Sequence, residues 1–119
     1  MNNLVELSSE LKKLIDESEI IAVASHLNPD GDNLGSATAM VGMLNKLGKN
    51  VVFVLDDKIP QSFKFLPNLS FAKAPDEIKN NFDLFIALDS SDENRMGYNI
   101  KKIFEASKKT VNIDHHFSN

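Results

Sequence analysis

Short apolar runs alternate along this chain with segments in which apolar residues recur at helical spacing. Four of the runs are rich in β-branched or other apolar side chains, which is typical of buried strands. They span residues 20–25, 51–55, 84–88 and 110–113. Helical spacing occurs at residues 4–15, 33–47 and 99–107, and a short helix is indicated at Pro75. This alternation predicts an α/β fold, with a parallel sheet of about four strands and helices on both faces.

The helix expected at residues 33–47 should turn one apolar face toward the sheet. The residues on that face are Ala37, Met40, Val41, Leu44 and Leu47. Gly48 follows the pattern directly and is typical of a helix end, because glycine readily adopts the left-handed conformation found there. Residues 59–69 contain two prolines and two phenylalanines and are expected to form a short helical turn and a loop.

Composition narrows the class of protein. With 119 residues and 42% apolar composition, the chain is expected to form one domain that folds without covalent cross-links. It has no cysteine, which excludes disulfides, thiolate metal sites and a cysteine nucleophile. No signal peptide or long apolar run is seen, so we expect a cytoplasmic protein without a membrane partner. The net charge of −4 argues against a broad basic surface for nucleic acid.

Potential metal ligands directly follow three of the predicted strands. They are His26, Asp30 and Asp32 after the first strand, Asp89 after the third, and Asp114, His115 and His116 after the last. Because parallel strands end at the same edge of a sheet, these side chains should meet there. Two divalent cations would relieve the repulsion of such a cluster, with Asp89 bridging them. The oxygen-rich donor set favours Mn²⁺ or Mg²⁺, and the histidines favour Mn²⁺.

Each cluster also has a structural explanation when it is taken alone. Residues 28–31, Asn-Pro-Asp-Gly, equally suit a β-turn. His115 and His116 also suit a protein surface or a helix cap. Asp92 and Arg95 fit loop structure better than chemistry, although Arg95 is a candidate for binding a substrate phosphate. The functional interpretation therefore depends on the clusters meeting at one edge.

Three motifs together resemble the DHH phosphoesterase superfamily, which is named for its Asp-His-His triplet. The motifs are SHLNPDGD at residues 25–32, LDSSD at 88–92 and NIDHH at 112–116. The resemblance covers the chain from about residue 20 to its end. Residues 65–67 and the tail 114–119 most resemble the branch of nanoRNases that also dephosphorylate 3′-phosphoadenosine 5′-phosphate.

The resemblance implies a set of metal ligands. His26, Asp30 and Asp89 would hold one Mn²⁺, and Asp32, Asp89 and His115 would hold the other, with Mg²⁺ or Co²⁺ as substitutes. Such a pair of cations hydrolyses phosphate esters by acidifying a water that attacks phosphorus in line.

The resemblance also implies roles for the remaining site residues. His116 would donate a hydrogen bond to the substrate phosphate, and Asp114 would orient the histidines. Asn33 stands where the family often has serine, and we expect it to adjust the loop without abolishing metal binding. The substrate would be a short RNA or a nucleotide.

The family has further parts that this sequence does not contain. They are a fourth metal-binding aspartate and a C-terminal domain that grips the nucleotide. Residues 1–119 are therefore expected to form an incomplete N-terminal DHH domain, which binds metal but hydrolyses poorly. An unprotected edge strand would also favour a homodimer.

Other functions fit parts of the same sequence. A receiver domain of a response regulator would use Asp89 as a phosphoacceptor, but its paired acids should follow the first strand, whereas Asp56 and Asp57 follow the second. Within the superfamily, cyclic dinucleotide phosphodiesterases and inorganic pyrophosphatases share the same metal motifs. A dinucleotide-binding domain is disfavoured because Gly31 and Gly35 do not have the required glycine spacing.

Overall fold

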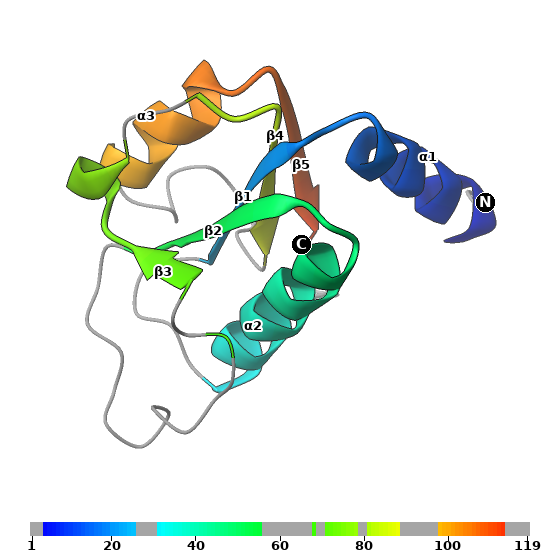
Figure 1. Cartoon of the computed structure of the whole chain (residues 1–119), viewed down its shortest axis with the longest axis horizontal. Helices are drawn as coiled ribbons and strands as arrows, with labels where there is room; N and C mark the ends of the chain where they lie inside the picture. Colours follow the sequence, from blue (N-terminus) through cyan, green and yellow to red (C-terminus); the bar gives the residue numbers. More distant parts are fainter. Residues whose placement is uncertain are drawn as a thin grey trace, which may run out of the picture.

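A computed structural model describes residues 4–25, 31–55, 68, 71–78, 81–88 and 98–113. Helices and parallel strands alternate along these residues, as the hydrophobic pattern predicts (Figure 1). The elements are α1 (Leu4–Asp16), β1 (Ile20–Ser25), α2 (Gly31–Lys46), β2 (Asn50–Val54), β3 (Ala72–Lys73), the 3₁₀ turn η3 (Pro75–Glu77), β4 (Leu84–Leu88), α3 (Tyr98–Ala106) and β5 (Lys109–Ile113).

The described strands form one parallel sheet in the order β3-β2-β1-β4-β5. The parallel sheet is confirmed, but it has five strands where about four were predicted. The additional strand, β3, is only two residues long and pairs with the end of β2. Its sequence, Ala72–Lys73, contains no apolar run, so the hydrophobic pattern could not reveal it.

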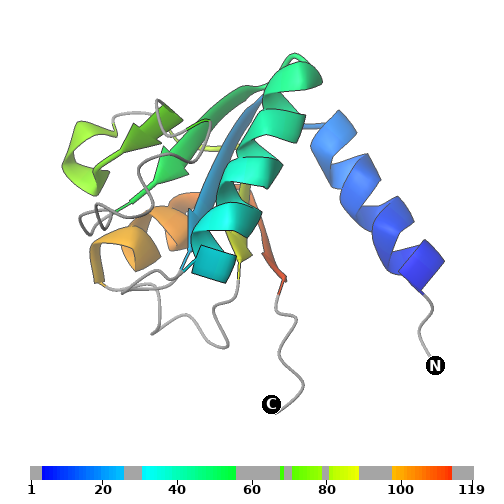
Figure 2. The same ribbon diagram turned by 90° about the horizontal axis from the view of Figure 1, so that it is seen from below.

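Helices cover both faces of the sheet, as predicted (Figure 2). Side chains alternate along β1, so that Ile21 and Val23 pack with α1 and α2 on one face. Ala22 and Ala24 point to the other face, where they pack with α3. Each face has its own buried apolar cluster, and the central strands β1 and β4 are shielded from water on both sides.

Helix α2 ends at the glycine that the sequence indicated. Gly48 has a φ of +83°, its N–H donates to Asn45 O at 3.0 Å, and Lys49 N–H donates to Leu44 O at 3.1 Å. This is the Schellman arrangement that closes many helices. The prediction that Leu47 faces the core is wrong, because it follows the last helical residue and is 56% exposed.

Asp83 ties β1 to β4 at the N-terminal edge of the sheet. Its carboxylate accepts hydrogen bonds from the backbone N–H groups of Glu19 and Ile20, at 3.0 and 3.1 Å. These bonds, with the Lys108 ammonium 3.4 Å away, hold the pKa of the Asp83 carboxyl below its usual range. The carboxylate therefore helps to fix how β1 and β4 are aligned.

Replacing Asp83 with asparagine should lower the free energy of unfolding at neutral pH. Because the pKa is lower in the folded state, the stabilisation is complete above the unfolded-state pKa of about 3.9 and disappears as the pH falls through the folded-state value. Urea unfolding of both proteins between pH 7 and pH 2 measures the difference. Asp16→Asn is the control, since the Asp16 carboxylate forms an exposed pair with Lys12, and such pairs contribute little to stability. A difference that stayed constant down to pH 2 would contradict this account.

Strand β5 lies at one edge of the sheet as far as the described residues show. The homodimer expected from an edge strand stays a prediction. No helix within the described ranges is long and apolar enough to cross a membrane.

Candidate metal centre

Each of the three motifs contains the last residue of a strand, and these three residues are aligned across adjacent strands. Ser25 at the end of β1 is paired with Leu88 at the end of β4, and Leu88 is paired with Ile113 at the end of β5. Neighbouring strands are about 4.8 Å apart, so these three ends form one short row. The next residues in the chain are His26, Asp89 and Asp114. The sheet therefore directs all three motifs to the same edge.

Most of the predicted site residues lie outside the described part of the chain. These are His26, Asp30, Asp89, Arg95, Asp114, His115 and His116, and Asp92, which was assigned to loop structure, also lies there. Their assigned roles stay predictions. Within the described residues, no group of three or more His, Asp or Glu side chains is arranged to hold a metal ion.

The backbone of Asp32 is described, and it lies in the first turn of α2. The sequence predicted that Asp32 would lie in the turn before a helix starting near residue 33, whereas α2 begins at Gly31. An acidic residue is favourable in this position because the first turn carries the positive end of the helix dipole. Asp32 is thus attached to a regular element that packs on the sheet.

Small residues near the start of α2 suggested either close packing or room for an anion. A Cβ added at Gly35 would meet no described atom within 4 Å, so packing does not require glycine there. Ala37 and Thr38 are buried against the sheet, and Thr38 Oγ1 donates to Gly35 O at 3.2 Å. The residues after Gly35 therefore hold the helix in place, and the space beside Gly35 contains no described atom within 4 Å of the position that a Cβ would take.

Asn68 fastens the connection between β2 and β3 to the middle of α2. Its Nδ2 donates to the Thr38 carbonyl at 3.1 Å, and its backbone is left-handed, with a φ of +68°. A Cβ added at Gly42 would lie 2.7 Å from this Nδ2, so the close approach depends on glycine in the helix. This contact was not predicted from the sequence, although asparagine adopts positive φ more readily than any other residue type except glycine.

Replacing Asn68 with alanine should lower the free energy of unfolding by about 2 kcal/mol. About 1 kcal/mol comes from the lost hydrogen bond and about 1 kcal/mol from placing alanine in a left-handed conformation. Asn68→Gly should lower the free energy of unfolding only by the contribution of the lost hydrogen bond, about 1 kcal/mol. Gly42→Ala should become stabilising by about 1 kcal/mol once Asn68 is glycine, because the clash is gone and alanine favours the helix. A urea-melt double-mutant cycle tests this, and additive effects would refute the contact.

The fold and the aligned strand ends define a parallel α/β domain in which three sequence motifs continue from the carboxyl ends of β1, β4 and β5. The sequence matches the DHH family, N-terminal domain, over residues 20–119. The chain belongs to this family, as its motifs indicated.

Two similar proteins are longer than this chain. The bifunctional oligoribonuclease and PAP phosphatase NrnA of Thermus thermophilus is 31% identical over 116 residues, which are 97% of this chain and 33% of that protein. The crystal structure of an exopolyphosphatase-related protein from Bacteroides fragilis superposes with a TM-score of 0.85 at 22% identity, covering 98% of this chain and 37% of that one. The second likeness supports the fold. The chain spans about a third of the length of each.

Proposed function

We propose that this protein is a Mn²⁺-dependent phosphoesterase acting on short oligoribonucleotides or on 3′-phosphoadenosine 5′-phosphate. The observation that carries the proposal is the alignment of Ser25, Leu88 and Ile113, the three strand ends that lie within the three family motifs. The similarity to the Thermus thermophilus oligoribonuclease and PAP phosphatase supports this choice of substrates.

The donor set suits the proposed metal. The three motifs supply imidazoles and carboxylates and the chain has no cysteine, a combination that favours Mn²⁺ over a structural zinc. His26, Asp30 and Asp89 would hold the first cation. Asp32, Asp89 and His115 would hold the second. Asp89 would be the shared ligand, and the place of β4 between β1 and β5 in the sheet supports this role.

The remaining residues would bind and orient the substrate. When bound, two divalent cations supply Lewis acidity and an acidified water for in-line attack on phosphorus. His116 would donate a hydrogen bond to a phosphate oxygen, while Asp114 would hold the histidine rings in the orientation that this requires. Arg95 would place its positive charge beside the negatively charged phosphate. These interactions would be strongest when the phosphate gains charge in the transition state.

A substrate panel with Mn²⁺ tests the proposal, with the Thermus thermophilus relative as the positive control. We expect a diribonucleotide to yield mononucleotides, 3′-phosphoadenosine 5′-phosphate to yield phosphate, and a chelator to stop both reactions. Preferential hydrolysis of pyrophosphate or a cyclic dinucleotide would redirect the assignment within the family. A stable phosphoryl group on Asp89 after incubation with acetyl phosphate would contradict it.

A further inference from the structure

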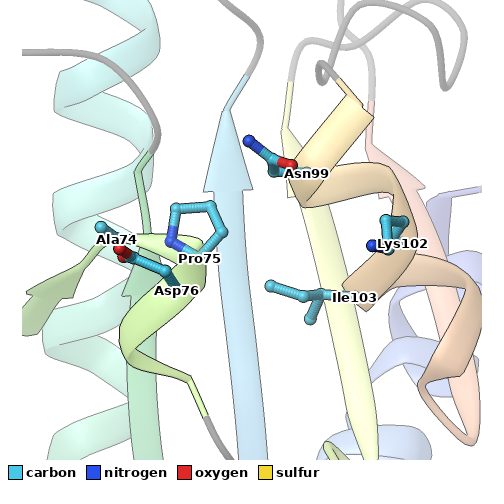
Figure 3. Close-up of a pocket in the computed structure, with 6 residues that line it drawn as sticks. All are labelled: Ala74, Pro75, Asp76, Asn99, Lys102 and Ile103. Carbon is cyan, nitrogen blue, oxygen red and sulfur yellow. The ribbon is translucent and has the colours of Figure 1, made fainter.

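A groove separates η3 from α3 on the face of the sheet opposite α2 (Figure 3). Its volume is about 530 Å³, which lies within the range of small-molecule sites in proteins. The residues that line it are Ala74, Pro75 and Asp76 on one side and Asn99, Lys102 and Ile103 on the other. None of these residues belongs to the three family motifs.

The two elements that form the walls of the groove, η3 and α3, are each fixed by contacts outside the groove. On one side, the Glu77 carboxylate accepts a hydrogen bond from Ala74 N–H at 2.8 Å, and Pro75 has a ring that fixes its backbone angle. On the other side, Ile100 is buried and Ile103 packs against the same apolar cluster, so α3 is fixed to the sheet. The groove is therefore formed by two elements whose positions are already set.

The groove opens toward the edge of the sheet that carries the family motifs. Figure 3 shows Asn99 near the C-terminal end of β1, with Lys102 and Ile103 farther along α3 and Pro75 facing them. Since β1 and β4 end in register, this end of the groove also lies toward the residues that precede His26 and Asp89. A ligand in the groove would thus run along the sheet, with one end toward the C-terminal ends of β1 and β4.

The chemistry of the lining matches one nucleotide. Pro75 and Ile103 offer apolar surface on opposite sides, suitable for the faces of a base. Asn99 carries both a donor and an acceptor for a base edge, and the Asp76 carboxylate can accept from a ribose hydroxyl. Lys102 supplies a cation for a phosphate. We propose that the groove between η3 and α3 binds one nucleotide of the RNA substrate beside the bond that is cleaved. This inference rests on the proposed function, since it assumes a nucleotide chain as the substrate.

Titrating the ¹⁵N-labelled chain with AMP in the presence of a chelator tests the groove without metal or catalysis. We expect the backbone signals of Ala74, Asp76, Asn99 and Ile103 to shift together. Lys102→Glu should weaken AMP binding about tenfold, because it replaces attraction for the phosphate with repulsion. Lys101→Glu is the matched control, since it makes the same charge change on the same helix outside the groove. Inorganic phosphate and adenosine, titrated separately, should each bind more weakly than AMP.

The outcomes separate the two proposals. If AMP shifts no groove signal, or if Lys101→Glu weakens binding as much as Lys102→Glu, the groove is not a nucleotide site, even if the hydrolysis panel succeeds. If AMP binds in the groove but the Mn²⁺-loaded protein hydrolyses no nucleotide substrate, the proposed function fails and the nucleotide site stands. Binding by inorganic phosphate as tight as by AMP would overturn the assignment of a whole nucleotide.

Discussion

Asp89→Asn is expected to lower phosphate-ester hydrolysis at saturating Mn²⁺ by at least about a hundredfold. Asp89 follows Leu88 at the end of β4, which lies between the two other strands that carry motifs. A carboxylate in this central position is the one that both proposed cations can share, and an amide lacks the negative charge to bridge them. Calorimetric titration of the metal-free protein with Mn²⁺ should show weakened binding, and initial rates give the effect on hydrolysis.

Asp92→Asn is the matched control for this experiment. It makes the same change in charge three residues further along the same segment, at a position to which no metal is assigned. The thermal midpoint of both variants without metal should stay close to that of the original chain, since asparagine and aspartate have nearly the same size and shape and each variant removes a single charge. Asp89→Asn binding Mn²⁺ as tightly as the original chain would contradict the bridging role.

Phe85→Ala should have the largest effect on stability, lowering the free energy of unfolding by about 3–5 kcal/mol. Phe85 is fully buried in the cluster that holds α3 to the sheet. Its ring meets that of Phe104 edge to face, with centroids 5.2 Å apart and planes at 80°. Alanine would leave a cavity between β4 and α3 that neither element can close, because β4 is paired on both sides. Urea denaturation at neutral pH measures the loss.

Two further variants separate the cavity from the ring contact. Phe85→Leu keeps most of the buried volume and should cost about 1–1.5 kcal/mol. Phe104→Ala removes the same ring pair from a half-buried position and should cost less than Phe85→Ala, since part of its side chain already meets water. Equal losses for Phe85→Ala and Phe104→Ala would show that the ring contact, and not burial, dominates this cluster.

Much of the fold could be predicted because its central strands are buried on both faces. The apolar runs at Ile20–Ser25 and Leu84–Leu88 have the predicted bounds, since continuous burial leaves a continuous apolar signal. The start of α2 was predicted less accurately. Helix α2 begins at Gly31, before the first residue of the apolar period, because that period marks the buried face of a helix and not its first residue. Leu47 matched the helical period but follows the last helical residue, within the Schellman ending, where it is exposed.

That the three motif-bearing strands end at one edge of the sheet could be predicted from topology, but the register of their last residues could not. Alternating strands and helices place all strand ends at one edge, whatever the details. The pairing of Ser25 with Leu88 depends on contacts such as those of Asp83 with Glu19 and Ile20, which no periodicity reveals. The groove was missed for a similar reason. Pro75 and Asn99 face each other only because η3 and α3 lie on the same face of the sheet.

The central place of β1 in the sheet has a consequence for the order of folding. β1, α2 and β2 follow one another along the chain, so they can assemble through local contacts. β4 reaches the other side of β1 only when positions 63 residues apart come together, as Ile20 and Asp83 do. Closing that longer loop costs more chain entropy. During synthesis β1, the strand that leads into the motif with His26, would therefore pair with β2 before the strands of the other motifs join the sheet. A cation that needs all three motifs would bind only the completed sheet, so it would stabilise the product of the last folding stage.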